Sequence, residues 1–145
     1  MLAIEITMLD PDLPVPSYAR AGDAGADMVA RVDVTIPAAG GRVVVPTGMA
    51  IAIPDGYAGF VLPRSGLAAN HGVTCVNAPG LVDSGYRGEL RVALVNTDPT
   101  TDYEVHRGDR IAQLVIQAVE HVAFTVVDHL PPTTRGEGGF GHSGR

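Results

Sequence analysis

Apolar and polar residues alternate with a period of two in three stretches of the chain. The apolar positions are Ile4, Ile6 and Met8 near the start, Val32, Val34 and Ile36 further on, and Val122, Phe124 and Val126 near the end. Side chains on a β-strand point alternately to opposite faces, so this spacing places the apolar residues of each stretch on one face. The pattern therefore predicts three half-buried strands.

Other parts of the chain are short apolar runs bounded by turn residues. The runs are GRVVVPTGMAIAI, YAGFVLP, VTCVN, ELRVALVN and RIAQLVI, and the turns between them are rich in Gly, Pro, Asn and Asp. Only residues 65–72 predict a short helix, capped by Ser65 and ended by Gly72. About eleven short strands in one layered domain indicate an all-β fold, either a jelly-roll-like β-sandwich or a barrel.

Composition narrows the class of protein further. The 145 residues suit one domain, and no apolar run approaches the length of a membrane span. The net charge of −6 argues against a general nucleic-acid binder, which needs a basic face. Cys75 is the only cysteine and lies in an apolar run, where it is expected to be buried and inert. With no secretory signal at the N-terminus, we expect a cytoplasmic protein that contacts neither nucleic acid nor membrane.

The stretch GLVDSGYRGEL contains the first candidate site. Asp83 to Tyr86 have the composition of a four-residue turn, which brings a carboxylate and a phenol ring to the two sides of one small space. That pair suits a sugar, with the ring covering its face and the carboxylate bonding a hydroxyl or a water. An ordinary hairpin turn would have the same composition.

Three further stretches offer polar groups. In PRSGLA, Arg64, Ser65 and the following backbone amides could bind an anion, although Ser65 could equally be a plain helix cap. In RGDRIAQLVI, Gln113 lies on the opposite face from Leu114 and could simply face solvent. In AGDAGADM, Asp23 and Asp27 lie in a glycine-rich turn and could be loop carboxylates or neighbours of a hydrated cation.

The last eleven residues, RGEGGFGHSGR, are too rich in glycine to fold alone. Gly136, Gly138 and Gly141 match the dinucleotide fingerprint G-x-G-x-x-G, but no strand and helix flank them, so the match carries no such meaning. Glycine amides together with Arg135 and Ser143 can instead wrap an anion.

In this order, the segments YARAGDAGADM, LPRSGLA, GLVDSGYRGEL, GDRIAQL and RGEGGFGHSG closely resemble the five motifs of the trimeric dUTPase family. The resemblance implies a jelly-roll subunit, a homotrimer whose active sites are shared between subunits, and Mg²⁺-dependent hydrolysis of dUTP to dUMP and pyrophosphate. Such an activity limits uracil in DNA and supplies dUMP for dTMP synthesis. Asp23 and His142 depart from the family pattern, which commonly has serine at both positions.

The resemblance also implies individual roles. Asp83 would be the general base for the water that attacks the α-phosphorus, and Gln113 would help hold that water. Tyr86 would pack under the deoxyribose. The remaining substrate contacts would be Asn77 with the backbone around Leu81 and Val82 at uracil, Phe140 stacked on uracil, Arg64, Ser65, Gly66, Arg135, Gly141 and Ser143 at the phosphates, and Arg91 on the strand after the turn. No protein group would bind Mg²⁺ directly, but Asp27 would lie near its waters.

In this interpretation residues 1–134 form the jelly-roll domain and residues 135–145 form a lid that orders over bound nucleotide. Two alternatives remain open. A dCTP deaminase of the same fold would need a glutamate on the strand after the turn, where this chain has Ala93. A jelly-roll module that only binds a nucleotide or a protein would have lost the base or an arginine, whereas Asp83, Arg64 and Arg135 are present. The four remaining histidines, His71, His106, His121 and His129, have no metal-ligand spacing and are expected at the surface.

Overall fold

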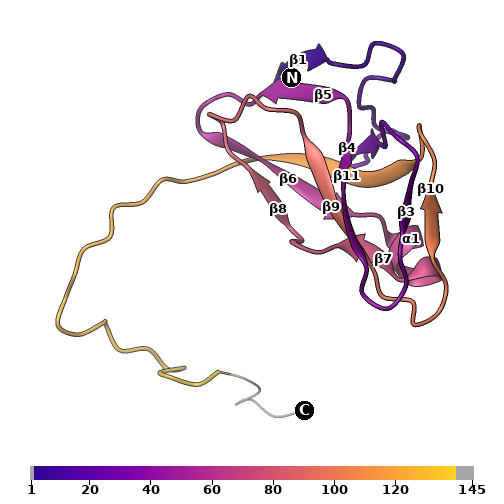
Figure 1. Ribbon diagram of the computed structural model, residues 1–145. Coiled ribbons are helices and arrows are strands. Elements are labelled where there is room, and N and C mark those ends of the chain that lie inside the picture. The colour runs from indigo at the N-terminus through magenta and orange to yellow at the C-terminus, as the bar shows by residue number, and fades with distance from the viewer. Residues whose placement is uncertain (1, 140–145) are drawn as a thin grey trace.

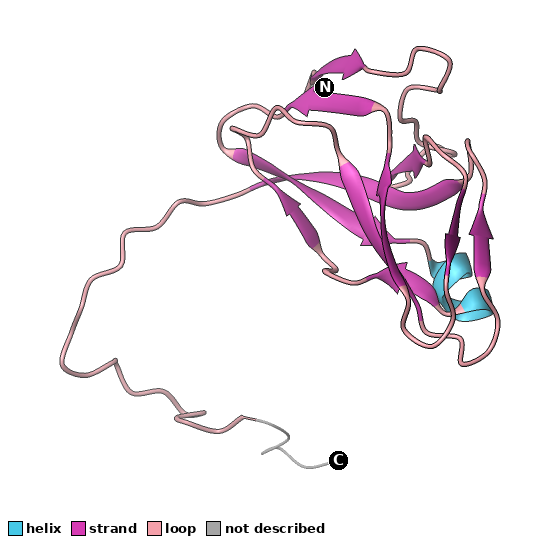
Figure 2. Ribbon diagram, viewed as in Figure 1, coloured by secondary structure: helices cyan, strands magenta, loops and turns pink. Residues whose placement is uncertain are grey.

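Antiparallel strands make up nearly all the regular structure of the chain, of which the computed structural model describes residues 2–139 (Figures 1 and 2). Within this range the elements are β1 (Glu5–Met8), β2 (Ala26–Val29), β3 (Val34–Ile36), β4 (Arg42–Pro46), β5 (Met49–Ala52), β6 (Tyr57–Pro63), α1 (Ser65–His71), β7 (Val73–Cys75), β8 (Gly80–Val82), β9 (Arg91–Asn96), β10 (Tyr103–Val105) and β11 (Arg110–Ala118). The predicted all-β class is confirmed, and so is the short helix.

Two larger sheets enclose the core. One has the strand order β2-β11-β6-β8 and the other has the order β4-β9-β7, while β1 pairs with β5 and β10 pairs with β3. Buried residues of both larger sheets, such as Leu114 on β11 and Leu94 on β9, belong to one apolar cluster. The side chains that fill this cluster alternate with more exposed ones along each strand, as in β9, where every second residue is buried.

Cys75 is part of this core, as predicted. It is 5% exposed, and burial raises the pKa of its thiol to about 11. A thiol that stays protonated at neutral pH is a poor nucleophile. The residue therefore contributes packing rather than chemistry.

The helix α1 begins at Ser65, one residue earlier than expected if Ser65 had been its N-cap. Arg64 occupies the N-cap position with extended backbone and no side-chain capping bond, so Ser65 is the first helical residue and the predicted Ser65 cap is wrong. Gly72 ends the helix in the left-handed conformation, with φ of 65°, as predicted. The Ser65 hydroxyl is consequently not used to cap the helix.

Two strand predictions need correction. Residues 119–130 form no strand, and Phe124 and Val126 are 94% and 98% exposed. The backbone bond from Val119 N to Gly56 O holds the start of this segment, after which the chain leaves the body of the fold (Figure 1). Alternation alone does not make a strand, because a strand also needs a partner backbone, and within residues 2–139 no ladder of backbone bonds continues beyond Val119. A turn prediction also needs correction. Asp27 was placed in a glycine-rich turn, but it lies on β2.

The strand at Val32, Val34 and Ile36 is shorter than predicted, since β3 begins at Val34 and Val32 is 40% exposed. The first predicted strand is confirmed as β1, which alternates between exposed and half-buried residues. No helix within residues 2–139 has the length and apolar character needed to cross a membrane.

Candidate active site

The turn between β8 and β9 forms one wall of a small cavity. Tyr86 N donates to Asp83 O at 3.1 Å, which closes the predicted four-residue turn. Both residues line a cavity of about 220 Å³, together with Leu81, Val82, Glu89, Leu90 and Arg91. A carboxylate and a phenol ring therefore border the same space, with apolar side chains between them, as the turn chemistry predicted.

The phenol of Tyr86 is held by the residues that follow it. Its hydroxyl donates to the carbonyl oxygen of Glu89 at 3.0 Å. The ring passes directly over Gly88, where an added Cβ would lie 2.4 Å from the Tyr86 oxygen. Only glycine at position 88 leaves room for the ring in this position.

Glu89 sits beside this turn and is tied to a different part of the chain. Its carboxylate oxygen accepts a bond from Gly48 N at 2.9 Å and pairs with the Arg31 guanidinium at 3.2 Å. The Nε of Arg91 lies 3.7 Å from its second oxygen. The side chain of Arg91 itself is 62% exposed at the rim of the cavity.

A second polar cluster lies where β2, β6 and β11 meet. Asp27 on β2 pairs with Arg64, with Nε–Oδ1 at 3.4 Å, and with Arg110, with Nη1–Oδ2 at 3.1 Å. Gln113 is the direct partner of Asp27 in the β11–β2 register. Gly25 allows this close approach, since a Cβ there would lie 3.0 Å from the Cβ of Gln113. The predicted Asp27, Arg64 and Gln113 are thus neighbours.

This cluster has unused bonding capacity. The Asp27 side chain is 12% exposed, yet its Oδ1 has no hydrogen-bond partner among residues 2–139. The same is true of Arg64 Nε, because the ion pair between these two atoms is not aligned as a hydrogen bond. Buried polar atoms normally have hydrogen-bond partners, so an acceptor and a donor that are joined only by an ion pair suit an additional polar ligand.

The start of α1 lies next to Arg64. Ser65 and Gly66 are exposed at the first turn, and nothing lies within 4 Å of the Cβ position of Gly66. The first backbone amides of a helix have no partner within the helix, so those at the start of α1 can bind an external acceptor. Asn77 is exposed in the loop before β8, and its Nδ2 lies against Gly80.

The two polar clusters do not meet within one chain. Val82 pairs with Gly59 on one side of β6, whereas Gln113 pairs with Leu62 on the other side. At the usual spacings along and between strands, the Cα atoms of Asp83 and Gln113 lie roughly 15 Å apart. Hydrogen bonds to a shared water require each group within about 3 Å of it. At this separation, Asp83 and Gln113 of one chain are poorly placed to hold one water.

The described part of the C-terminal segment is exposed up to Glu137 and makes local bonds. Arg135 Nε donates to Gly138 O at 2.8 Å, and Gly136 N bonds to Thr133. The predicted contacts of Phe140, Gly141 and Ser143 lie outside the described residues, as does the departure at His142. Asp23 closes the turn that precedes β2, where its carboxylate accepts a bond from Arg20 N at 2.8 Å.

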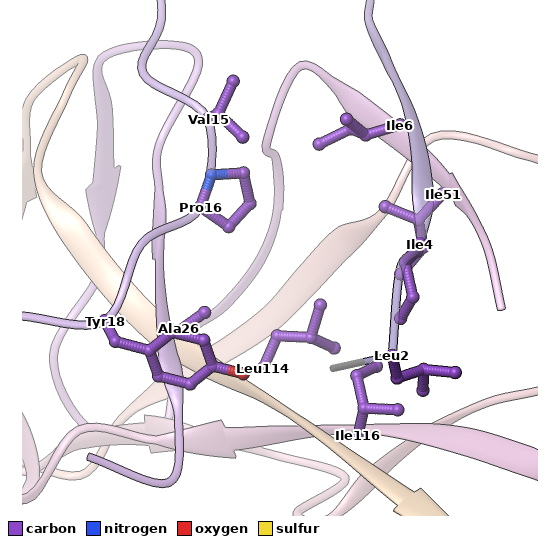
Figure 3. Close-up of a pocket in the computed structure, with 10 residues that line it drawn as sticks. All are labelled: Leu2, Ile4, Ile6, Val15, Pro16, Tyr18, Ala26, Ile51, Leu114 and Ile116. Carbon is purple, nitrogen blue, oxygen red and sulfur yellow. The ribbon is translucent and has the colours of Figure 1, made fainter. Parts of the chain in front are cut away.

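A separate apolar pocket of about 320 Å³ is lined by residues of the N-terminal segment, β1, β2, β5 and β11. Figure 3 shows Val15 and Pro16 on one side and Ile4 and Ile6 on the other, with Leu114 and Ile116 between them. Exposed Leu2 and Tyr18 complete its rim. Its lining contains no charged side chain, so it is unsuited to a nucleotide phosphate.

Comparison with known proteins shows the family to which this fold and sequence belong. The dUTPase family model matches residues 12–144. The chain belongs to the dUTPase family. It is similar to the deoxyuridine 5'-triphosphate nucleotidohydrolase of Thermobifida fusca, with 63% identity over 141 residues that cover 97% of this chain and 78% of the relative. High identity over nearly the whole chain identifies it as a dUTPase-type enzyme rather than a non-catalytic module.

Solved dUTPase structures have the same fold. The dUTPase of Staphylococcus bacteriophage 80alpha with dUPNHPP superposes with a TM-score of 0.90 at 25% identity, over the full length of both chains. The dUTPase of phage phi11 of S. aureus, in a mutant form with a structural Mg(II) ion, superposes with a TM-score of 0.80 at 22% identity, over 90% of this chain and all of that one. The predicted jelly-roll-like fold is confirmed.

Two polar residues within the motif segments were not given a role by the sequence prediction. Arg110 was not singled out, although it pairs with Asp27. Glu89 was not singled out either, because its partners Arg31 and Gly48 are far away in the sequence. The residues 2–139 contain no group of three or more His, Cys, Asp or Glu side chains placed to hold a metal ion, and the four described histidines are exposed, as predicted.

Proposed function

We propose that this dUTPase-family enzyme hydrolyses dUTP to dUMP and pyrophosphate through attack of a water on the α-phosphorus, with Asp83 as the general base. The observation that carries the proposal is the turn that places Asp83 and Tyr86 at one cavity beside an apolar wall. Phosphoryl transfer depends mainly on positioning and charge neutralisation, so one well-placed base suffices.

Substrate selection follows from the same cavity. Tyr86 covers the face of the deoxyribose, so a 2'-hydroxyl has no space. Asn77 and the backbone near Leu81 and Val82 pair with the edge of uracil. Backbone and amide groups discriminate well in such a site, because a wrong base leaves them without partners.

The phosphates bind to the second cluster. Arg64 offers a planar guanidinium, and Ser65 and Gly66 offer a hydroxyl and free amides at the start of α1. The lid residues 135–145 close over the nucleotide, with Arg135 and Ser143 at the phosphates and Phe140 on uracil. Water is thereby excluded and the charges inside the site interact more strongly.

The residues present fit a magnesium ion that arrives with the triphosphate. No set of carboxylates forms a cage among residues 2–139, but Asp27 offers a buried oxygen without a hydrogen-bond partner there. Such an oxygen suits a water of the hydrated ion, since Mg²⁺ usually keeps several waters. The ion would neutralise part of the phosphate charge, and Arg110 would hold Asp27 in place.

We propose a homotrimer in which each complete site is built from more than one chain. The roughly 15 Å between Asp83 and Gln113 within one chain is bridged when the Asp83 turn of one subunit faces the Gln113 cluster of its neighbour. The lid of the third subunit then covers the nucleotide. Each subunit supplies one part to each of three sites.

The segment 120–130, termed the arm, is the proposed link between subunits. Its exposed Val122, Phe124 and Val126 alternate as on a strand, and the apolar pocket beside β1 is uncovered. β1 pairs only with β5 among the described strands, so its other edge can accept a further strand. The arm of one subunit would dock there on another, which gives the predicted alternation its missing partner.

Pyrophosphate release from each of the common deoxy- and ribonucleoside triphosphates tests the proposed reaction. We expect release from dUTP alone, and loss of nearly all of it in Asp83→Asn. Asp55→Asn is the matched control, because Asp55 is an exposed carboxylate in another turn. Full activity in Asp83→Asn would refute the base, and ammonia release from dCTP would instead indicate the deaminase alternative.

A further inference from the structure

Glu89 lies beside the turn formed by Asp83 to Tyr86. It is neither the proposed general base nor one of the proposed phosphate or uracil contacts. Its side chain is only 12% exposed, which is unusual for a glutamate. The carboxylate is fixed by Gly48 N and by Arg31, at 2.9 and 3.2 Å. A buried carboxylate with a backbone donor and a guanidinium on one oxygen is held rigidly, because both bonds are charge-assisted.

The ion pair of Glu89 with Arg31, which anchors the Glu89 side chain, is part of a longer series of ion pairs that leads away from the site. Arg31 Nε also lies 3.4 Å from Asp10, and Arg107 donates to both oxygens of the same Asp10 carboxylate. The hydrogen bond from Arg107 is the main reason that the pKa of Asp10 is lowered to about 2. A chain of alternating charges therefore runs from the β10–β11 turn to Glu89.

The main chain of Glu89 in turn holds Tyr86. The Tyr86 hydroxyl donates to Glu89 O at 3.0 Å, while Gly88 leaves the space that the ring occupies. The ring position thus depends on where the Glu89 backbone lies, and the Glu89 side chain ties that backbone to Gly48. Leu90, the next residue, is fixed as well, by a bond from its N to Met49 O at 2.8 Å.

We propose that Glu89 is a positioning residue for Tyr86 and thereby determines how strongly the enzyme rejects ribonucleotides. The proposal rests on the proposed function, in which Tyr86 covers the deoxyribose. A hydroxyl is excluded only if the ring is held within a fraction of an ångström, so a loosened anchor lets UTP enter. Loss of the anchor then affects discrimination between sugars more than it affects the chemical step.

The test compares kcat/KM for dUTP and for UTP in the full-length enzyme. In Glu89→Ala we expect the dUTP preference to fall by about tenfold or more, mainly through KM. Glu89→Gln should retain part of the preference, since its amide oxygen can still accept from Gly48 N. Tyr86→Phe should lower the preference by a similar factor, because it removes the same hydrogen bond. Glu104→Ala, at an exposed glutamate bonded to Thr35, should match the wild type.

The double variant Glu89→Ala with Tyr86→Phe decides whether the two residues act together. If Glu89 acts through the Tyr86 hydroxyl, the double variant should be no less selective than Tyr86→Phe alone. An unchanged preference in Glu89→Ala, or fully additive losses, would overturn the proposal. If Glu89→Ala does not fold, Glu89→Gln and Gly88→Ala, which displaces the ring directly, decide the question by the same ratio. Failure of the proposed function would look different, since Asp83→Asn would then keep its dUTP activity.

Discussion

Replacing both Phe124 and Val126 of the arm by serine is expected to break the assembly of the chain into trimers. The two side chains are 94% and 98% exposed in the single chain, so docking onto a neighbour would bury almost all of their surface. Burial of an apolar side chain of this size contributes about 1.5–3 kcal/mol. The double substitution should therefore weaken each docked arm by roughly 3–6 kcal/mol.

This loss translates into a large change in assembly. Each 1.4 kcal/mol is about a tenfold change in a dissociation constant, so each arm contact should weaken by about 10² to 10⁴-fold. Sedimentation velocity over a series of dilutions measures the effect, and circular dichroism checks that the β-fold is retained. Val15→Asp places a charge in the proposed receiving pocket and should have the same effect from the other side.

The matched control is Val32→Ser, because Val32 is also an exposed valine but lies outside the arm and the pocket. It should leave the assembly unchanged. Trimers of the arm variant that persist to the same dilution as the wild type would refute the docking of residues 120–130. Dissociation in the arm variant but not in Val15→Asp would show that the arm docks elsewhere.

Three further predictions concern the lid, an ion pair and the core. A chain ending at Thr134 should form trimers with an unchanged melting temperature, because the hydrogen bonds of Arg135 and Gly136 are local. Its turnover of dUTP should fall at least about a hundredfold, because the lid is missing. Unaltered turnover would exclude a lid. The pKa of Asp10 is lowered from 3.8 to about 2, chiefly by Arg107, so the ion pair should stabilise the fold above about pH 4 and lose this effect as the pH falls toward 2. In urea unfolding, the free energy of unfolding of Asp10→Asn should therefore depend less on pH between about 2 and 4 than that of the wild type. The same pH dependence in both proteins would contradict this prediction. Leu94→Ala, at a core position that is 1% exposed, should lower the free energy of unfolding by about 2–5 kcal/mol in chemical denaturation, whereas a loss below about 1 kcal/mol would mean that the core closes around the cavity.

The sequence was most informative where local chemistry decides the structure. The turn at Asp83 and Tyr86 was predicted from residue types within four positions, and its closing hydrogen bond is present. The helix end at Gly72 was likewise predicted, because a left-handed residue is most easily provided by glycine. Its beginning was misplaced by one residue, since a serine can either cap a helix or start one, and the local sequence does not distinguish the two.

Prediction failed where a structure depends on distant partners. β2 was taken for part of a turn because Gly22 and Gly25 dominate the local composition, yet Gly25 is there to let β2 lie against Gln113 of β11. Glu89 was overlooked for the same reason, since its partners Gly48 and Arg31 are 41 and 58 residues away. Such contacts are set by the order of strands in the sheets, which alternation of side chains does not reveal.

The arm is a case in which the local sequence pattern is clear but the structure depends on a partner. The alternation of Val122, Phe124 and Val126 predicted a half-buried strand, but among the described residues this segment forms no strand and these side chains are exposed. The proposed roles of Asp83 and Gln113 raise a similar question, since roughly 15 Å separates their Cα atoms within one chain, and in the proposed mechanism both contact one water. In the proposed trimer, the association of chains would supply a partner for the arm and bring the two half-sites together. If the trimer forms as proposed, the apolar residues of the arm, which are exposed in the single chain, are the ones that its interface would bury.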